Sequence, residues 1–185
     1  MQVSKQIITL PEWPSLRLKP EREPGIHVSD VIKYMKERLG YDKNRAGGWD
    51  LETTWRIGLL FEEALALAFQ DANAPSIGAF LKDGIWLTPD GYDPRERKIH
   101  EYKVTWRSLN KFAPEDDFAY QTQIKSYCHA VGVNKAVLWV LFLMGDYKGT
   151  GPKLLQLDLE YSPHELESNW QMLINNAKAM TKGEK

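Results

Sequence analysis

A continuous apolar run at residues 135–144 (KAVLWVLFLM) constrains the fold of this chain more than any other feature. A strand with one face in water alternates apolar and polar side chains, whereas this run places apolar side chains on both faces. It therefore predicts an inner strand of a β-sheet that is covered on both sides by helices.

Weaker patterns predict the elements around this strand. Further strands are expected over residues 78–87, 98–106 and 153–159. Four helices are expected. The first covers residues 31–39, between the cap Ser29 and Gly40, and the second is a long helix that ends at about residue 70 and is capped by Asp50, Thr53 or Thr54. The third begins at Pro114 and Asp116 and ends at Gly132, and the C-terminal helix follows the capping box of Ser162, Pro163 and Glu165. The order α-α-β-β-α-β-β-α predicts an α/β fold, a single domain with a central mixed β-sheet flanked by helices.

The 185 residues suffice for one domain with a full hydrophobic core. Residues 1–26 contain four prolines (Pro11, Pro14, Pro20 and Pro24), which favours an irregular N-terminal arm. The expected domain then covers residues 27–185.

Composition narrows the classes of function. No apolar run approaches the roughly 20 residues that cross a bilayer, so no membrane association is expected. Cys128 is the only cysteine, which excludes an intramolecular disulfide and favours a reducing, cytoplasmic compartment. The net charge of −1 leaves room for a local basic patch but argues against a large one.

The segment from Pro89-Asp90 to Glu101-Tyr102-Lys103 carries the chemistry. On a strand, Glu101 and Lys103 project from the same face, and Asp90 lies near the end of the preceding strand. Two carboxylates beside an amine can hold a divalent cation and place a water near a phosphodiester. Asp-Gly is also a common turn, and Glu-x-Lys a common solvated pair, so this motif alone leaves both interpretations open.

A third acid comes from the segment RIGLLFEEALALAFQ, which is apolar nearly all round and is therefore expected to be a buried helix. Glu63 shares a helix face with Leu60 and Leu67. A metal ion shared with Asp90 and Glu101 would compensate for its burial, and so would a basic partner or an edge that reaches solvent.

Further candidates lie on either side of these acids. Gln123 and Tyr127 are four residues apart on one helix face, where they can hydrogen-bond to a site group or to a substrate backbone. Lys43, Arg45 and Arg107 are candidate phosphate contacts by charge and neighbourhood, although exposed solvated cations explain them equally well.

Taken in order, these motifs resemble one family, the PD-(D/E)XK nucleases, and within it the RecB-like and lambda-exonuclease-like (YqaJ) branch. The matching features are Gly58 with Glu62-Glu63, then Pro89-Asp90-Gly91, Glu101-Tyr102-Lys103, and Gln123 with Tyr127. The opening HVSDVIKYMKERLG is similar to the first helix of the RecB-like members. Many RecB-like members carry His just before the motif glutamate, a position held here by Glu62, so Glu62 and Glu63 both stay open as the motif glutamate, and alignment on Gly58 favours Glu63. The cysteines that bind an iron–sulfur cluster in some relatives are missing.

The resemblance implies a nuclease that hydrolyses DNA with Mg²⁺ or Mn²⁺. Asp90, Glu101 and the main-chain carbonyl of Tyr102 would hold the metal, with Glu63 as a further ligand or water-orienting group. Lys103 would position the attacking water, and Gln123 would orient the site or contact the scissile strand. Tyr127 is expected at the DNA.

The branch favours an exonuclease of recombination, repair or processing. A structure-specific or nicking endonuclease and a non-catalytic nucleic-acid-binding module share the same core and stay open as alternatives. The resemblance also leaves open a homo-oligomer or a recombination partner protein, and it fits the cytoplasm of a bacterium or a phage-infected cell.

Overall fold

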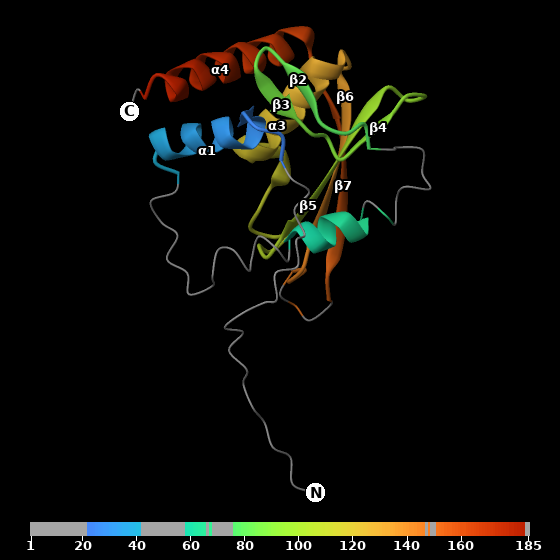
Figure 1. The fold of residues 1–185 in the computed structure, drawn as a ribbon. Helices are drawn as coiled ribbons and strands as arrows, with labels where there is room; N and C mark the ends of the chain where they lie inside the picture. The colour runs from blue at the N-terminus through green and yellow to red at the C-terminus, as the bar shows by residue number, and fades with distance from the viewer. Residues whose placement is uncertain are drawn as a thin grey trace, which may run out of the picture.

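The computed structural model describes residues 22–41, 58–65, 67, 76–146, 148 and 151–183. Within these ranges helices and strands form the mixed α/β architecture expected from the sequence (Figure 1). Two β-sheets are present: a four-stranded sheet with the order β4-β5-β6-β7 and a three-stranded sheet with the order β1-β3-β2.

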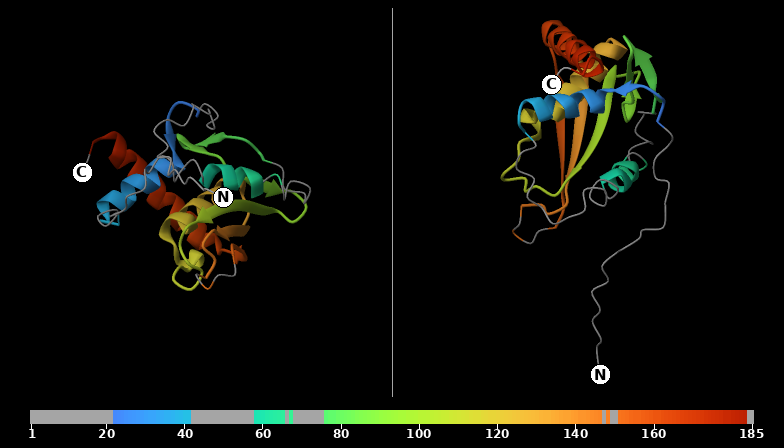
Figure 2. Two further views of the ribbon diagram at one scale, coloured as in Figure 1. Left: turned by 90° about the horizontal axis from the view of Figure 1, so that it is seen from below. Right: turned by 60° about the vertical axis from the view of Figure 1, so that its left-hand side comes forward.

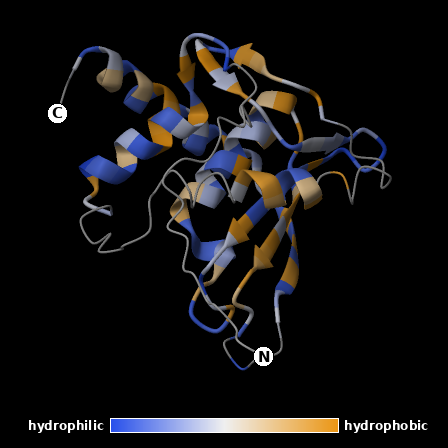
Figure 3. Ribbon diagram, turned by 60° about the horizontal axis from the view of Figure 1, so that its bottom comes forward, coloured by the Kyte–Doolittle hydropathy of each residue, from blue (hydrophilic) through white to orange (hydrophobic). Residues whose placement is uncertain are grey.

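The four-stranded sheet is built around β6 (Lys135–Phe142), the strand predicted from the apolar run. β6 pairs parallel with β5 (Lys98–Thr105) and antiparallel with β7 (Lys153–Glu160). Ala136, Leu138 and Val140 are fully buried on one face of β6. Apolar and polar residues alternate along the outer strand β7, as Figure 3 shows by colour. The expectation of an inner strand is confirmed.

β4 (Gly91–Asp93) is a short strand that the sequence patterns did not predict. It pairs antiparallel with the first residues of β5, with Gly91 opposite His100. The connection closes through Asp93, whose side-chain oxygen accepts hydrogen bonds from the main chain of Arg95 and Glu96. This short hairpin places Asp90, the residue just before β4, next to the middle of β5.

The strand expected over residues 78–87 is instead a hairpin of β2 (Phe80–Lys82) and β3 (Ile85–Leu87). The turn consists of Asp83 and Gly84, whose φ angles of 50° and 80° lie in the left-handed region. Asp-Gly is a strong signal for a two-residue hairpin turn. β3 also pairs parallel with the two-residue strand β1 (Ile26–His27).

Three helices cover one side of the four-stranded sheet. α3 (Phe118–Val131) packs on β5 and β6, and α4 (Pro163–Thr181) packs on α3 and on α1 (Val28–Arg38) (Figure 2). α3 follows a short 3-10 helix, η1 (Pro114–Asp116). It is capped by Asp117 and ends at Gly132, whose φ is 77°. α4 begins with the expected capping box of Ser162 and Glu165.

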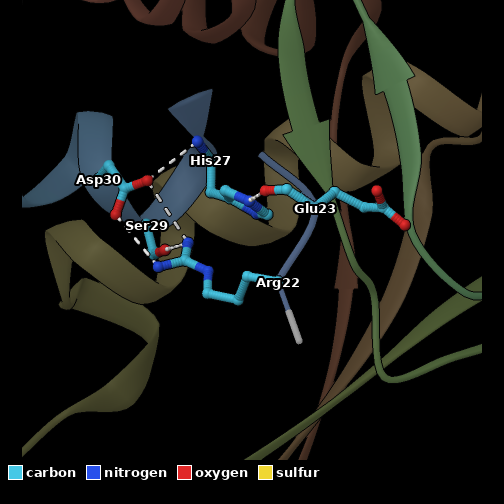
Figure 4. A network of polar contacts seen from close by, with 5 residues as sticks. All are labelled: Arg22, Glu23, His27, Ser29 and Asp30. Atoms are coloured by element: carbon cyan, nitrogen blue, oxygen red, sulfur yellow. Dashed lines mark hydrogen bonds and ion pairs between the residues drawn. The ribbon is translucent and has the colours of Figure 1, made fainter. Parts of the chain in front are cut away.

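The start of α1 is set by residues other than the expected cap. The N-cap is His27, whose main-chain N–H donates to the Asp30 carboxylate at 3.0 Å. Ser29 lies inside the helix, where its hydroxyl accepts a hydrogen bond from Arg22 at 2.9 Å (Figure 4). Arg22 also pairs with Asp30, so the described end of the expected N-terminal arm is tied to α1.

A further helix covers residues 58–65 and 67 and lies beside β5, where its Glu62 approaches Lys103 (Figure 2). The expectation that this helix is buried is wrong for its described residues. Leu60, Phe61 and Leu67 are exposed. The expected caps Asp50, Thr53 and Thr54 lie outside the described residues.

Among the described residues, no helix is both long enough and apolar enough to cross a membrane.

The central position of β6 leads to a stability prediction. Replacing Leu138 by alanine removes a fully buried side chain and should lower the free energy of unfolding by about 2–5 kcal/mol. The matched control is Leu154→Ala on β7, where the side chain is 46% exposed and the loss should be well under half as large. Urea denaturation followed by circular dichroism measures both, and equal losses would contradict the inner position of β6.

Candidate active site

The site is centred on two residues of β5 that project from the same face, Glu101 and Lys103. The ammonium of Lys103 donates a hydrogen bond to Glu101 Oε1 at 2.5 Å. Glu101 is only 1% exposed and the Lys103 side chain 14%. The alternation predicted for this strand is confirmed, but the pair is buried, which excludes a solvated surface pair.

Asp90 lies beside this pair because of how β3, β4 and β5 are connected. Its Oδ2 accepts a hydrogen bond from the main-chain N–H of Tyr102 at 2.8 Å. That N–H belongs to the residue between Glu101 and Lys103, so the Asp90 carboxylate is fixed next to both. The structure thus brings together Asp90, Glu101 and Lys103.

The third acid at this position is Glu62, the alternative to the favoured Glu63. Glu62 Oε1 lies 3.9 Å from Lys103 Nζ, and the Glu62 side chain is 27% exposed. Glu63 is exposed and makes no ion pair among the described residues. Successive residues of a helix point about 100° apart, so only one of the two glutamates can face β5. The alignment on Gly58 favoured the outward-facing one.

Burial raises the pKa values of all three acids. Burial and then the charge of Asp90 raise the pKa of Glu101 to about 8, although Lys103 opposes the shift. Burial likewise raises the pKa values of Asp90 and Glu62, against the opposing charge of Lys103. Burial disfavours the charged form of Lys103 itself, but Glu101, Glu62 and Asp90 outweigh it and hold its pKa well above the usual range. Three carboxyl groups thus lie near a single ammonium at this site.

One oxygen of this site has no partner. Glu101 Oε2 is buried and accepts no hydrogen bond among the described residues. An unpaired buried carboxylate oxygen is costly, and a cation is the partner that would remove both this cost and the excess negative charge. Oxygen ligands from Asp90, Glu101 and the Tyr102 carbonyl suit Mg²⁺ or Mn²⁺, which bind proteins through one or two carboxylates and keep several waters.

A complete cage of protein ligands is absent from the part of the chain that the structure describes. No three His, Cys, Asp or Glu side chains there are arranged so that they alone could hold a metal ion. The donor set fits a partly hydrated hard cation on two carboxylates.

Gln123 and Tyr127 lie on the face of α3 nearest to the site. The Gln123 side-chain amide donates to the Tyr127 hydroxyl at 2.8 Å. Tyr127 is 3% exposed, so the expectation that it contacts DNA directly is corrected: its hydroxyl orients Gln123. Burial is the main cause of the raised pKa of Tyr127, with Glu101 and Asp90 contributing, which places its hydroxyl near the acids.

The three predicted phosphate contacts have different outcomes. Arg107 lies two residues beyond β5, and its side chain is 63% exposed. Lys43 and Arg45 lie outside the described residues.

Tyr120 was missed in the sequence analysis. It lies one turn before Gln123 on the same face of α3 and is half-buried. Burial raises its pKa to about 12, and the charges of Lys103, Asp117, Glu62 and Arg107 all act on it. The available signal was its spacing of three and seven residues from Gln123 and Tyr127.

Comparison with known proteins shows the fold. No protein-family profile matches the chain, and no curated protein matches it by sequence. Among solved structures, the chain is similar to a phage-related exonuclease from Haemophilus somnus 129PT, with 13% identity, a TM-score of 0.51, and coverage of 80% of this chain and 78% of that chain. It is also similar to the alkaline exonuclease LHK-Exo from Laribacter hongkongensis, with 14% identity, a TM-score of 0.54, and coverage of 85% and 90%.

A second structure of LHK-Exo, in complex with dAMP, has a TM-score of 0.55 at 14% identity and coverage of 86% of this chain and 89% of that chain. The chain therefore has the fold of these exonucleases. At the level of fold, the resemblance to the lambda-exonuclease-like branch of the PD-(D/E)XK nucleases is confirmed.

The raised pKa of Glu101 predicts how the stability of the metal-free protein depends on pH. The pKa is about 8 in the folded state against an ordinary value of 4.5, so the folded state binds the extra proton between these values. The stabilisation is complete below pH 4.5 and is lost as the pH rises through 8. In EDTA, the free energy of unfolding should fall over this window by up to about 1.4 kcal/mol per pH unit.

Glu101→Gln removes this titration and should show a distinctly shallower slope in the same urea titrations. Parallel slopes for the two proteins would contradict the raised pKa.

Proposed function

We propose that this protein is a metal-dependent deoxyribonuclease that hydrolyses DNA phosphodiester bonds with Mg²⁺ or Mn²⁺ and acts as an exonuclease. The observation that carries the proposal is the unpartnered Glu101 Oε2, buried beside Asp90 and Lys103. A purely structural ion pair would satisfy both oxygens of a buried carboxylate.

Each residue of the site has a role that follows from its position. Asp90 and Glu101, with the Tyr102 carbonyl, would hold the cation, which when bound lowers the pKa of a water and shields the phosphate charge. Lys103 keeps its proton, because its pKa is raised well above the usual range. It therefore acts as a fixed positive charge that orients the attacking water and stabilises the charge that develops on the phosphate.

Glu62 and Gln123 complete the arrangement. Glu62 lies 3.9 Å from Lys103 and is partly exposed, so it can accept a hydrogen bond from the attacking water and orient it. Gln123 takes its orientation from Tyr127, and its side-chain oxygen would contact the substrate strand. Tyr127 thus acts through Gln123.

DNA is favoured as substrate, and an exonuclease as activity, by the fold that the chain shares with the phage-related and alkaline exonucleases, one of which was solved with dAMP. Endonucleases share the same core, so the substrate topology has to be tested directly. Linear and circular double-stranded DNA and single-stranded DNA are incubated with the protein in Mg²⁺, Mn²⁺ or EDTA. The proposal is supported if linear DNA is degraded, circular DNA is not, and degradation requires a metal ion. Cutting of intact circles identifies an endonuclease. Binding of DNA without cleavage identifies a binding module.

Lys103→Ala tests the role of the ammonium. The rate of metal-dependent DNA cleavage should fall by at least about a hundredfold, the typical loss when one charge-stabilising donor is removed. DNA binding, measured by fluorescence anisotropy, should be much less affected. Lys98→Ala on the same strand is the matched control, because Lys98 pairs with Asp158 near the start of β5. Undiminished cleavage by Lys103→Ala would exclude Lys103 from the mechanism.

Asp90→Asn tests the ligand assignment. The substitution retains the hydrogen bond from Tyr102 but removes a charge, so the affinity for Mg²⁺ or Mn²⁺ in isothermal titration calorimetry should fall at least about tenfold. Asp93→Asn is the control, because the Asp93 side chain accepts its hydrogen bond from the main chain of Arg95 in the β4–β5 turn. Equal metal affinity of the wild-type and Asp90→Asn proteins would refute the role of Asp90.

A further inference from the structure

Arg107 is carried by a loop that hydrogen bonds hold in place. Its main-chain N–H donates to Thr105 Oγ1 at 3.1 Å, and Thr105 is buried. Further along the loop, the N–H of Leu109 donates to the Gly145 carbonyl at 3.0 Å. The backbone that presents Arg107 is therefore fixed relative to β5.

The Arg107 side chain is also held in place. Its guanidinium carbon lies 4.4 Å from the ring centroid of Phe112, and Nη1 lies 3.8 Å from Asp117 Oδ2. The other oxygen of Asp117 accepts the capping N–H groups of Ala119 and Tyr120. One face of the guanidinium is thus covered and one edge is loosely paired.

The N–H groups of this guanidinium stay available for a ligand. None of the hydrogen bonds among the described residues uses them, and 3.8 Å is too long for a hydrogen bond to Asp117. A planar guanidinium offers five N–H donors in a geometry that matches two phosphate oxygens. An arginine fixed by a ring and left with free donors is prepared for an anion, because little side-chain entropy remains to be lost.

Tyr120 links this arginine to the catalytic residues. The Phe112 ring packs edge-on against Tyr120, with the centroids 5.8 Å apart. The charges of Lys103, Glu62, Arg107 and Asp117 all act on the Tyr120 hydroxyl. Arg107, Phe112 and Tyr120 are thus in contact one after another, and Tyr120 lies on the same face of α3 as Gln123.

We propose that Arg107, seated on Phe112, binds the phosphate next to the one that is cut, and so makes the enzyme specific for polynucleotide strands. The inference rests on the proposed nuclease function and extends it. Lys103 faces the scissile phosphate, and the strand continues past Tyr120 to Arg107, where its adjacent phosphate displaces Asp117. When Arg107 turns to the phosphate, Asp117 keeps its hydrogen bonds to the main chain at the N-terminal end of α3.

The test combines Arg107→Ala with oligonucleotides in which one phosphate at a time is replaced by an uncharged methylphosphonate. On the all-phosphate strand, kcat/KM for the first cut should fall at least about tenfold, the effect of one charge-assisted hydrogen-bonding contact. With the phosphate adjacent to the cut neutralised, the wild-type and Arg107→Ala proteins should cleave at rates within about twofold of each other. Neutralising more distant phosphates should leave the tenfold difference in place.

Two further variants sharpen the test. Arg107→Lys keeps the charge but loses the planar stack, so it should restore only part of the activity. Arg97→Ala removes an exposed arginine at the opposite end of β5, where the side chain bonds to the Gly132 carbonyl, and should cleave like the wild type.

The outcomes separate the two proposals. If the wild-type protein leaves every DNA uncut with Mg²⁺ and Mn²⁺, the nuclease function fails, and this inference fails with it. Two results would overturn the role of Arg107 and leave the nuclease function standing, provided that the wild type cleaves DNA. In the first, Arg107→Ala has the same kcat/KM as the wild type. In the second, the difference between the two proteins is the same whichever phosphate is replaced by a methylphosphonate.

Discussion

The buried contact between Lys103 and Glu101 is the interaction on which the rest of the site depends. Transferring these two charges from water into a protein interior costs several kcal/mol for each ion. One hydrogen bond between them leaves the second Glu101 oxygen unpaired, and Asp90 adds a further negative charge nearby. Burial is the main cause of the raised pKa of Glu101, and the nearby charge of Asp90 adds to it. A bound cation would offset both effects, because it would neutralise charge and give the unpaired oxygen a partner.

The fold supplies the rigidity that this arrangement needs. β5 lies between the short strand β4 and the inner strand β6, and α3 packs on β5 and β6. Because β4 is only three residues long, its main contribution is to place Asp90 against the Tyr102 N–H. α3 then brings Tyr120, Gln123 and Tyr127 to the same site from one helix face. Residues far apart in the sequence are thus held by neighbouring elements of one sheet and its covering helix.

The sequence predicted those features that depend on local patterns. The apolar run gave β6, the Ser162–Glu165 box gave the start of α4, and alternation gave the shared face of Glu101 and Lys103. Where the outcome depends on tertiary contacts, the prediction was incomplete or wrong. β4 has too few residues to show a period, and the Asp83-Gly84 turn divides a segment that looked like one strand. Glu62 and Glu63 cannot be distinguished until the side of the helix that faces β5 is known, because the apolar residues on its outer side resemble a buried face.

The net charge of −1 has a consequence for how such a protein would hold a polyanion. Long-range attraction cannot supply much affinity, because the charges of the whole molecule nearly cancel and salt screens them beyond about 8–10 Å. Binding must then depend on a few cations that are placed before DNA arrives. Lys103 is held by carboxylates and Arg107 by an aromatic ring and a carboxylate, so both cations are oriented before a phosphate binds. A phosphate strand that spans both cations would meet two ordered positive groups in a protein whose net charge is close to zero. This favours recognition of the strand at the site itself over accumulation of DNA across the whole surface.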